Sequence, residues 1–278
     1  MFPFTDGQKR RLLELGAVPS VCGAEFAFPT QREHQFKILE KELVNESKLK
    51  LQTLREQTRR PALLILQQDI EKALCEEGFV QVSTPLILAK KLLEKMSIGD
   101  EHALSSQVFW LEGDRCLRPM LAPNLYSLSI DLLRIWEKPV RIFEIGSCFR
   151  KESQGSRHLN EFTMCNLVEW GLPEETRMTR VKELAHVVMT AAGIEEYDLK
   201  ETDSEVYGPS LDVVQGDTEL ASGNIGPHFL DVNWGIRSTW VGLGFGLERL
   251  LMTRQKTNNI HCVGKSLSYL DGVRLKIN

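Results

Sequence analysis

Two arginines lie in surroundings that suit the binding of phosphate groups. Residues 141–152 predict a strand that presents Arg150 and Glu152, two positions apart, on one face. In residues 242–251 a glycine-rich strand end runs into a helix and places Arg249 in the first turn of that helix. An arginine fork matches phosphate oxygens, glycines let the backbone approach a nucleotide, and a helix N-terminus favours anions. Together these residues predict a nucleotide phosphate site.

Other interpretations of the same residues fit less well. The glycines follow G-x-G-x-G, whereas a dinucleotide fold requires G-x-G-x-x-G early in a βαβ unit, and no G-x-x-x-x-G-K-[ST] is present. Taken alone, Arg249 is equally well explained by a surface ion pair with Glu248. The six cysteines are scattered without C-x-x-C or zinc spacing, so we expect reduced thiols rather than a zinc site.

The elements that would position these groups follow from hydrophobic periodicity. Thr5 predicts the start of a short helix that Gly16 ends, and Thr30-x-x-Glu33 has the form of a capping box for a charged helix reaching residue 60. Further helices are predicted over 63–74 and 181–192, and strands over 79–85, 108–111, 140–145, 162–168, 212–214, 219–222 and 240–243. Neighbouring strands with few intervening helices indicate an α+β fold, with an antiparallel sheet flanked by helices.

The chain divides into two predicted parts, a helical extension over residues 1–60 and a larger domain over 61–278. Of its 278 residues, 42% are hydrophobic and 26% are charged, an ordinary globular composition. No apolar run approaches the ~18–20 residues of a membrane span, and the first residues lack the layout of a signal peptide, so we expect a cytoplasmic protein. A net charge of −4 argues against binding nucleic acid over the whole surface.

The extension nevertheless carries a local concentration of positive charge. We call this set the basic stripe: Lys48, Lys50, Arg55, Arg59 and Arg60. Only Glu56 opposes it within the segment. Such a stripe can bind the phosphates of a nucleic acid. Charge alone favours the simpler interpretation of a solvated helix face.

Three motifs occur in the order typical of class II aminoacyl-tRNA synthetases. They are a helix and strand ending at Pro85, Arg150-x-Glu152, and Gly244-Phe-Gly-Leu-Glu-Arg249. Within this class the chain resembles the pyrrolysyl-tRNA synthetases, in the segments LRPMLAPNLY (117–126), FEIGSCFRKES (143–153), EFTM (161–164), VYG (206–208), GLGFGLERLL (242–251) and SYLDG (268–272). The resemblance is strong over 60–278. Residues 1–60 look like the short helical N-terminus of members without a separate tRNA-binding domain, which implies a tRNA contact there.

The resemblance implies ATP and Mg²⁺ as cofactors. Arg150 and Arg249 would be the catalytic residues that bind the phosphates, and Glu219 with Ser222 would hold the magnesium. An amino-acid carboxylate is already a nucleophile at neutral pH, so the site must align reactants and neutralise charge rather than supply a base. The other nucleotide-binding positions implied are Glu152, on the adenine side, His158, Leu159, Phe162, which would stack on adenine, Met164, Leu220 and Gly244.

The resemblance also implies a large amino-acid pocket suited to a long lysine derivative. Asn166 would hydrogen-bond the amide carbonyl of the substrate, and Tyr207 would reach its ring end. Buried polar groups of this kind reject analogues that lack a partner. The remaining substrate-binding positions are Leu121, Ala122, Leu125, Tyr126, Ser129, Val168, Asn224, Trp240 and Gly242.

Three positions depart from the family pattern. Ser129 stands in place of a bulkier apolar residue, Cys165 in place of leucine, and Asn224 in place of a small apolar residue. Ser129 would widen the pocket, and Asn224 would introduce a donor and an acceptor that need partners. These changes leave the identity of the amino-acid substrate open, but they do not affect the type of reaction expected.

The implied activity is ATP-dependent activation of pyrrolysine or a related lysine derivative, followed by transfer to a cognate, suppressor-type tRNA. The first motif usually builds a two-fold interface, so a homodimer is expected. Two alternatives stay open. One is a class II synthetase for another amino acid, such as a phenylalanine analogue. The other is a non-catalytic RNA-binding paralogue, against which the presence of Arg150, Glu219 and Arg249 argues.

Overall fold

The chain forms two compact units. The computed structural model describes residues 1–152, 158–204, 208–257 and 259–277. One unit comprises Met1–Leu64 with His261–Asn278, and the other comprises Ile65–Ile260. The C-terminal residues therefore share a unit with the N-terminal helices, whereas the sequence grouped them with the larger domain. None of the helices within the described ranges is both long and apolar enough to cross a membrane.

The first unit is built mainly from helices. Thr5 begins α1 with a capping box, in which Thr5 and Gln8 exchange side-chain-to-backbone hydrogen bonds of 3.0 and 3.2 Å, so the predicted start is confirmed. Phe4 and Leu12 pack in a small core with Cys22. The elements are β1 (Phe2–Pro3), α1 (Asp6–Glu14), α2 (Pro19–Cys22), β2 (Glu25–Phe26), α3 (Pro29–Thr53), α10 (Ile260–Val263), which begins at the unit boundary, β13 (Tyr269–Leu270) and β14 (Val273–Arg274).

The long helix α3 begins differently from the prediction. Phe28 is its N-cap and makes no side-chain capping bond, and Pro29 is the first helical residue. The capping box predicted at Thr30 is therefore wrong, because proline has no N–H to satisfy and its φ already suits a helix start. Beyond Thr53 the helix continues as a π-helical turn, Leu54–Thr58, which ends at Arg59 with a φ of 54°.

The second unit is organised around a seven-stranded sheet in the order β3-β7-β8-β12-β11-β10-β9. Among the described strands of this sheet only β3 and β7 pair in parallel, so the predicted antiparallel α+β architecture is confirmed. Its strands are β3 (Val80–Gln81), β7 (Val140–Phe149), β8 (Glu161–Trp170), β9 (Asp198–Ser204), β10 (Gly208–Gln215), β11 (Thr218–Gly226) and β12 (Trp240–Gly246). A separate three-stranded sheet holds β4 (Ile87–Ala89), β6 (Arg115–Leu117) and β5 (Trp110–Leu111).

Two strands show where periodicity misleads. The strand predicted over 79–85 pairs with the sheet only at Val80–Gln81, because the chain then turns away toward a buried polar network described below. The edge strand β9 escaped prediction. Its exposed, charged residues lack an apolar alternation, which is how native sheets protect an edge.

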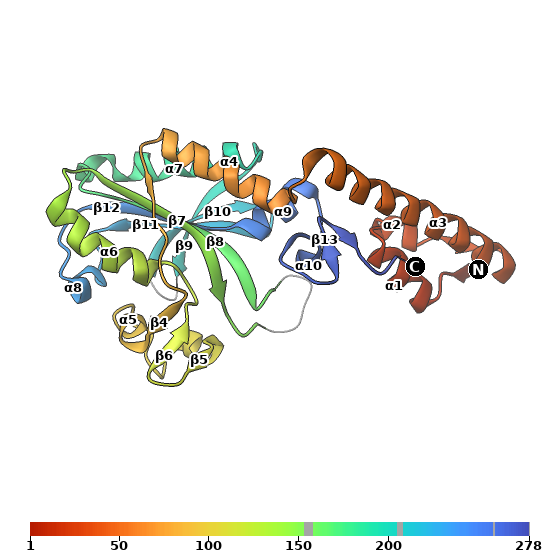
Figure 1. Ribbon diagram of the computed structural model, residues 1–278, viewed down its shortest axis with the longest axis horizontal. Coiled ribbons are helices and arrows are strands. Elements are labelled where there is room, and N and C mark those ends of the chain that lie inside the picture. Colours follow the sequence, from red (N-terminus) through yellow and green to blue (C-terminus); the bar gives the residue numbers. More distant parts are fainter. Residues whose placement is uncertain (153–157, 205–207, 258, 278) are drawn as a thin grey trace. The chain divides into compact units, whose positions relative to one another are not determined.

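Helices cover both faces of the sheet. Helices α4 and α7 lie along one side and α6 along the other (Figure 1). A side chain added at Gly223 would lie 2.8 Å from Leu243 and 3.3 Å from Val181 of α7, so this face is tightly packed. The helices of this unit are α4 (Ala62–Glu76, which starts in the first unit), α5 (Lys90–Glu94), α6 (Ala122–Ile135), α7 (Arg177–Ala191), α8 (Asp231–Trp234) and α9 (Leu247–Gln255).

Candidate active site

A cavity of about 510 Å³ lies over the sheet face opposite α7. This volume is ordinary for a small-molecule site. The cavity is lined by all eleven residues expected around the nucleotide: Arg150, Glu152, His158, Leu159, Phe162, Met164, Glu219, Leu220, Ser222, Gly244 and Arg249. It is also lined by eight of the residues expected around the amino acid: Ala122, Leu125, Tyr126, Asn166, Val168, Asn224, Trp240 and Gly242. One continuous space thus joins both sets.

Strand register builds the floor of this cavity in rows. Along the first row, Asn166 of β8 pairs with Gly244, Gly244 pairs with Ser222, and Ser222 pairs with Asp212 of β10. A Cβ added at Gly244 would lie 3.1 Å from the Asn166 amide nitrogen, so glycine leaves room for that amide. We call these four residues the Asn166 row.

A second row lies two residues further along the strands. Val168 pairs with Gly242, and Gly242 pairs with Asn224. Ser210 continues the row, because its neighbour Leu211 pairs with Gly223. Side chains two residues apart face the same side of a strand, so this Asn224 row lies beside the Asn166 row on one face.

Arg150 lies at one end of the cavity, where we expect phosphates. Strand β7 ends at Phe149, so the predicted strand stops one residue before Arg150. The Arg150 guanidinium donates from Nε to the carbonyl of Pro119 at 3.0 Å and lies 5.4 Å from the centre of the Phe162 ring. Burial is the main cause that lowers the pKa of Arg150 from its usual value. An arginine so placed still carries its charge at neutral pH, because its ordinary pKa exceeds ~12.

Arg249 lies in the first turn of α9 at the same end. Its Nη1 is 3.7 Å from the Glu219 carboxylate and donates to the Glu219 carbonyl at 3.2 Å. Glu248 does not lie at the surface, as the surface ion pair considered above requires. Glu248 is 1% exposed, and both of its carboxylate oxygens accept the Thr163 N–H at 2.9 Å. Arg249 therefore points its charge toward the cavity.

A β-bulge brings Glu219 and Ser222 into the same cavity. Regular alternation would place residues three apart on opposite faces of β11. The register shifts, however, because Val213 pairs with Ala221 while Val214 pairs with Glu219, which leaves Leu220 as an extra residue. Such a bulge re-aims neighbouring side chains. As a result Glu219, Leu220 and Ser222 all line the cavity.

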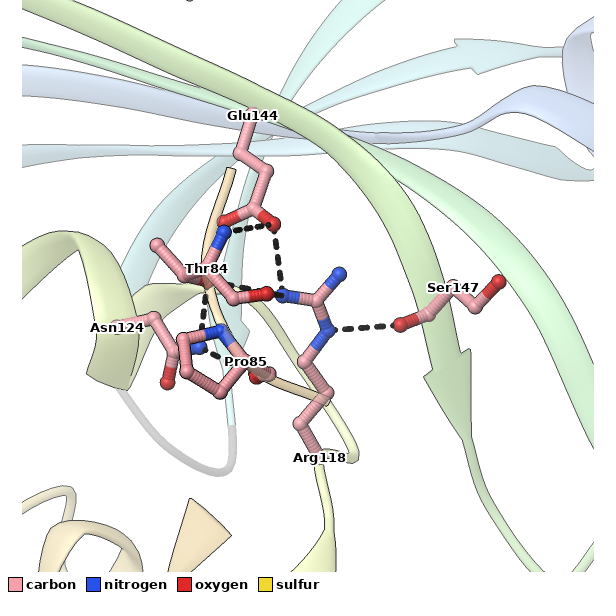
Figure 2. A network of polar contacts seen from close by, with 6 residues as sticks. All are labelled: Thr84, Pro85, Arg118, Asn124, Glu144 and Ser147. Carbon is pink, nitrogen blue, oxygen red and sulfur yellow. Dashed lines mark hydrogen bonds and ion pairs between the residues drawn. The ribbon is translucent and has the colours of Figure 1, made fainter. Parts of the chain in front are cut away.

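A buried polar network lies beside the cavity floor, where Glu144 of β7 pairs with Asn166 (Figure 2). Arg118 and Glu144, each 2% exposed, form an ion pair of 2.7 Å. The Arg118 guanidinium also donates to the Ser147 carbonyl at 2.8 Å and to the Thr84 hydroxyl at 2.9 Å. Because the Phe149 N–H donates to the Arg118 carbonyl at 2.9 Å, the network holds the end of β7, directly before Arg150.

The opposite end of the cavity is aromatic. Tyr126 stacks on Trp234 with ring centres 5.1 Å apart and meets Trp170 and Trp240 edge-on at 5.6 and 6.1 Å. The buried carboxylate of Asp231 accepts hydrogen bonds of 2.8 Å from both the Tyr126 hydroxyl and the Trp240 indole N–H. Asp231 therefore fixes two walls of the pocket from outside it.

Comparison with known proteins places this chain in a family. Residues 46–271 match the family model described as tRNA synthetases class II core domain (F). The crystal structure of pyrrolysyl-tRNA synthetase from Desulfitobacterium hafniense is similar, with a TM-score of 0.94 and 54% sequence identity, over 100% of this chain and 99% of that chain. The chain belongs to the pyrrolysyl-tRNA synthetase family.

Other relatives of this pyrrolysyl-tRNA synthetase family member include a second solved structure of the Desulfitobacterium hafniense enzyme. It has a TM-score of 0.91 and 52% identity, over 99% of this chain and 96% of that one. The threonine--tRNA ligase of Treponema pallidum is 29% identical over 97 residues, 34% of this chain and 16% of that protein. The O-phosphoserine--tRNA(Cys) ligase of Methanoculleus marisnigri is 29% identical over 146 residues, 47% of this chain and 27% of that protein. The chain thus spans a small part of the length of these curated relatives.

Three residues expected at the pyrrolysyl-type pocket lie elsewhere or outside the described residues. Leu121 and Ser129 are fully buried but are not among the residues that line the cavity. Tyr207 falls in 205–207, outside the residues that the structure describes.

Cys165 is fully buried and alternates with Asn166, so it faces the α7 side of the sheet. The cysteine found where the family has leucine therefore affects the packed face of the sheet rather than the cavity lining.

Sequence reasoning also missed residues of this family member's site. Asp231 and Arg118 do not line the cavity but hold residues that do or that lie next to them, and such contacts are visible only in the tertiary structure. The cavity lining that was not predicted consists of Leu104, Met120, Leu167, Trp170, Thr202, Ser210, Asp212, Leu243, Gly246, Glu248 and Ile260. Alternation would have found Asp212 and Ser210 only if their pairing with β11 had been known.

Proposed function

We propose that this chain is an ATP-dependent ligase that activates pyrrolysine, or a related lysine derivative, and transfers it to a cognate, suppressor-type tRNA. The observation that carries the proposal is one cavity whose cationic end, at Arg150 and Arg249, is joined to an aromatic end, at Tyr126 and Trp240. The Asn166 amide lies between them on the cavity floor. A long substrate can place its carboxylate at the first end and its acyl group at the second.

The chemistry needs alignment and charge neutralisation. The α-carboxylate of the amino acid is ionised at neutral pH and attacks the α-phosphorus of ATP, and pyrophosphate leaves. Arg150 and Arg249 bind the phosphates and neutralise the charge that grows on their oxygens. A hydroxyl of the terminal ribose of the tRNA then attacks the acyl carbon, and AMP leaves. The attack on phosphorus requires no side-chain base, because the attacking carboxylate is already ionised.

The residues present fit ATP with Mg²⁺. Class II synthetases use both, and the carboxylate of Glu219 and hydroxyl of Ser222 would hold the ion, which supplies neutralising charge at the phosphates. Within the described ranges, no group of three or more His, Cys, Asp or Glu side chains converges as metal ligands. A site with one carboxylate suits magnesium, because this ion is commonly bound by one or two carboxylates and completes its coordination shell with water and phosphate oxygens. Phe162 and Glu152 would contact the adenine, beside His158, Leu159, Met164, Leu220 and Gly244.

At the other end, Asn166 would hydrogen-bond the amide carbonyl of the substrate. Its side-chain oxygen is buried, and in the described part of the chain it has no hydrogen-bond partner. That oxygen accepts hydrogen bonds, so it favours a ligand that offers a donor such as an N–H, while the Asn166 side-chain N–H donates to the substrate carbonyl. The apolar walls would be Ala122, Leu125, Tyr126, Val168, Trp240 and Gly242, with Leu121 and Ser129 behind them and Tyr207 at the ring end.

The first unit would contribute to tRNA binding. All five residues of the basic stripe are exposed, at the end of α3 and in the turn that follows. Exposed lysines and arginines bind nucleic-acid phosphates with little dependence on sequence. We also propose that the enzyme is a homodimer, since the first motif of the class usually forms a two-fold interface; sedimentation of the purified chain tests this directly.

The deciding experiment is amino-acid-dependent ATP–pyrophosphate exchange. The panel is pyrrolysine, simpler Nε-acyl lysines and the twenty standard amino acids. We expect exchange with the lysine derivatives. Exchange with a standard amino acid alone would keep the chemistry and overturn the substrate, and silence across the panel in a folded protein that still binds tRNA would support a non-catalytic paralogue.

A further inference from the structure

The Asn224 row contains two buried polar groups that lack partners within the described part of the chain. Asn224 and Ser210 are each 9% exposed. Among the residues that the structure describes, neither the Asn224 side-chain oxygen nor the Ser210 hydroxyl has a hydrogen-bond partner. Leaving such groups without partners is costly, so native proteins rarely do so without a ligand or water to complete them.

Both groups face the cavity from neighbouring strands. Ser210 precedes Leu211 on β10, and Asn224 follows Gly223 on the antiparallel β11. Because Leu211 pairs with Gly223, the two residues lie opposite each other on the face that carries Ser222 and Asp212. Both line the cavity, as does Thr202, which pairs with Ser210 on the edge strand β9. Three hydrogen-bonding side chains therefore stand side by side along one row.

This row lies deeper than Asn166 on the path away from the phosphates. Arg249 lies in the first turn of α9, which follows β12 directly, and from there the rows pass through Gly244, then Gly242, and then Trp240. Neighbouring rows are two residues apart, roughly 6.6–6.8 Å along a strand. A substrate whose amide lies at Asn166 therefore extends its acyl group past Asn224 before it meets the aromatic end.

The chemistry of the row indicates what it recognises. Its members, Val168, Gly242, Asn224 and Ser210, carry no charge, and neither does the adjoining Thr202. A charged group there would lack a counter-ion in the row, and burying an unpaired charge is costly. A plain alkyl group would leave both polar side chains unsatisfied. A neutral hydroxyl can both donate to the Asn224 oxygen and accept from Ser210.

We propose that Asn224 and Ser210 form a second polar contact for the substrate, and that this enzyme prefers Nε-acyl lysines bearing a hydroxyl near the far end of the acyl group. The inference rests on the proposed function and narrows its substrate class. Asn224 is then a specificity residue rather than a neutral replacement in the pocket wall.

The test compares two substrates that differ by one hydroxyl, Nε-pentanoyl-lysine and Nε-(ω-hydroxypentanoyl)-lysine, in ATP–pyrophosphate exchange. We expect the unaltered enzyme to favour the hydroxylated substrate by about tenfold in kcat/KM, the value of one good hydrogen bond. Asn224→Leu, or Asn224→Val should the first variant fold poorly, abolishes that preference, and Ser210→Ala reduces it.

Ser238→Ala is the matched control, because its hydroxyl is also buried without a partner in the described chain but does not line the cavity. This variant should keep the full preference. Equal kcat/KM for the two substrates in the unaltered enzyme, or a preference that survives in a folded Asn224 variant, would overturn the inference while leaving lysine-derivative activation intact. Absence of exchange with either substrate or with pyrrolysine would instead overturn the proposed function, and the inference with it.

Discussion

The two ends of the cavity are built in different ways. The phosphate end draws its arginines from two short motifs, and its ion pair is open to solvent, with the Arg249 and Glu219 side chains 42% and 52% exposed. The aromatic end is buried and assembled from α6, α8, β8 and β12, around Asp231. The phosphate end provides positive charge to neutralise the phosphates, while the aromatic end determines the shape of the amino-acid pocket. Changes at the first end should therefore alter the chemistry, and changes at the second should alter which substrate binds.

The largest effect should come from Arg249→Ala. Removing a guanidinium that stabilises the transition state lowers adenylate formation by about 10³-fold or more in ATP–pyrophosphate exchange. Thermal unfolding should barely change, since the side chain is half exposed. Arg254→Ala, in the last turn of the same helix, removes the same charge away from the cavity lining and should retain activity. Near-normal exchange by Arg249→Ala would contradict the assignment of the phosphate end.

Arg118→Met tests the buried polar network around Arg118 and Glu144. This change leaves the Glu144 carboxylate buried without its cation, so the free energy of unfolding should fall by about 3–5 kcal/mol in urea denaturation. Arg134→Met serves as control, because Arg134 is 75% exposed and its pair with Asp131 spans 3.5 Å. A similar small decrease for both variants would show that the network of Figure 2 does not anchor β7.

Asp231→Asn should separate binding from chemistry at the aromatic end. The amide keeps the shape but weakens the hydrogen bonds from Tyr126 and Trp240, so we expect KM for the amino acid to rise about tenfold, with kcat and KM for ATP little changed. The exposed Asp131→Asn provides a matched control on α6. If kcat fell and the KM for the amino acid stayed constant, the division of labour between the two ends would be wrong.

Neutralising the basic stripe should affect only the step that involves tRNA. We expect weaker tRNA charging, and the salt dependence of tRNA binding should decrease by about one unit of slope for each phosphate that the variant no longer binds. Adenylate formation should stay the same. Neutralising Lys37 and Lys41, which lie earlier on α3, is the control to compare with neutralising Lys48 and Lys50, because each pair removes two charges from the same helix. Unchanged charging kinetics at moderate salt would remove the stripe from the tRNA site.

The smallest effect should come from Cys165→Ala, on the packed face of β8. Because this side chain is buried on the α7 side, the variant should lose about 1 kcal/mol of stability without changing the relative kcat/KM of different lysine derivatives. The comparison with Asn224→Leu, on the cavity face, contrasts the two sides of one sheet. A changed substrate preference in Cys165→Ala would show that the packed face also shapes the pocket.

Much of this architecture was predictable because its signals are local. The strands β7, β8 and β12 carry apolar residues in runs that only a buried sheet tolerates, and the glycines before Arg249 mark a strand end running into a helix. Motif order and family-like segments also identified the residues that line the nucleotide end, since each lies within a few positions of an arginine or a strand. The start of α3 was misjudged because Thr30 and Pro29 both suit the first turn of a helix, and the choice depends on one residue.

The sequence by itself determined the antiparallel class, the motif residues and the family, because these depend on spacing along the chain. Only the tertiary structure decided which way individual side chains face. The extra residue at Leu220 turns Glu219 to the side of Ser222, and alternation sends Cys165 away from the pocket that Asn166 enters. It also brought Asp231 under Tyr126 from a distant segment. A shift of one residue reverses the face of every side chain that follows it in a strand, and such shifts are set by pairing between strands rather than by local sequence.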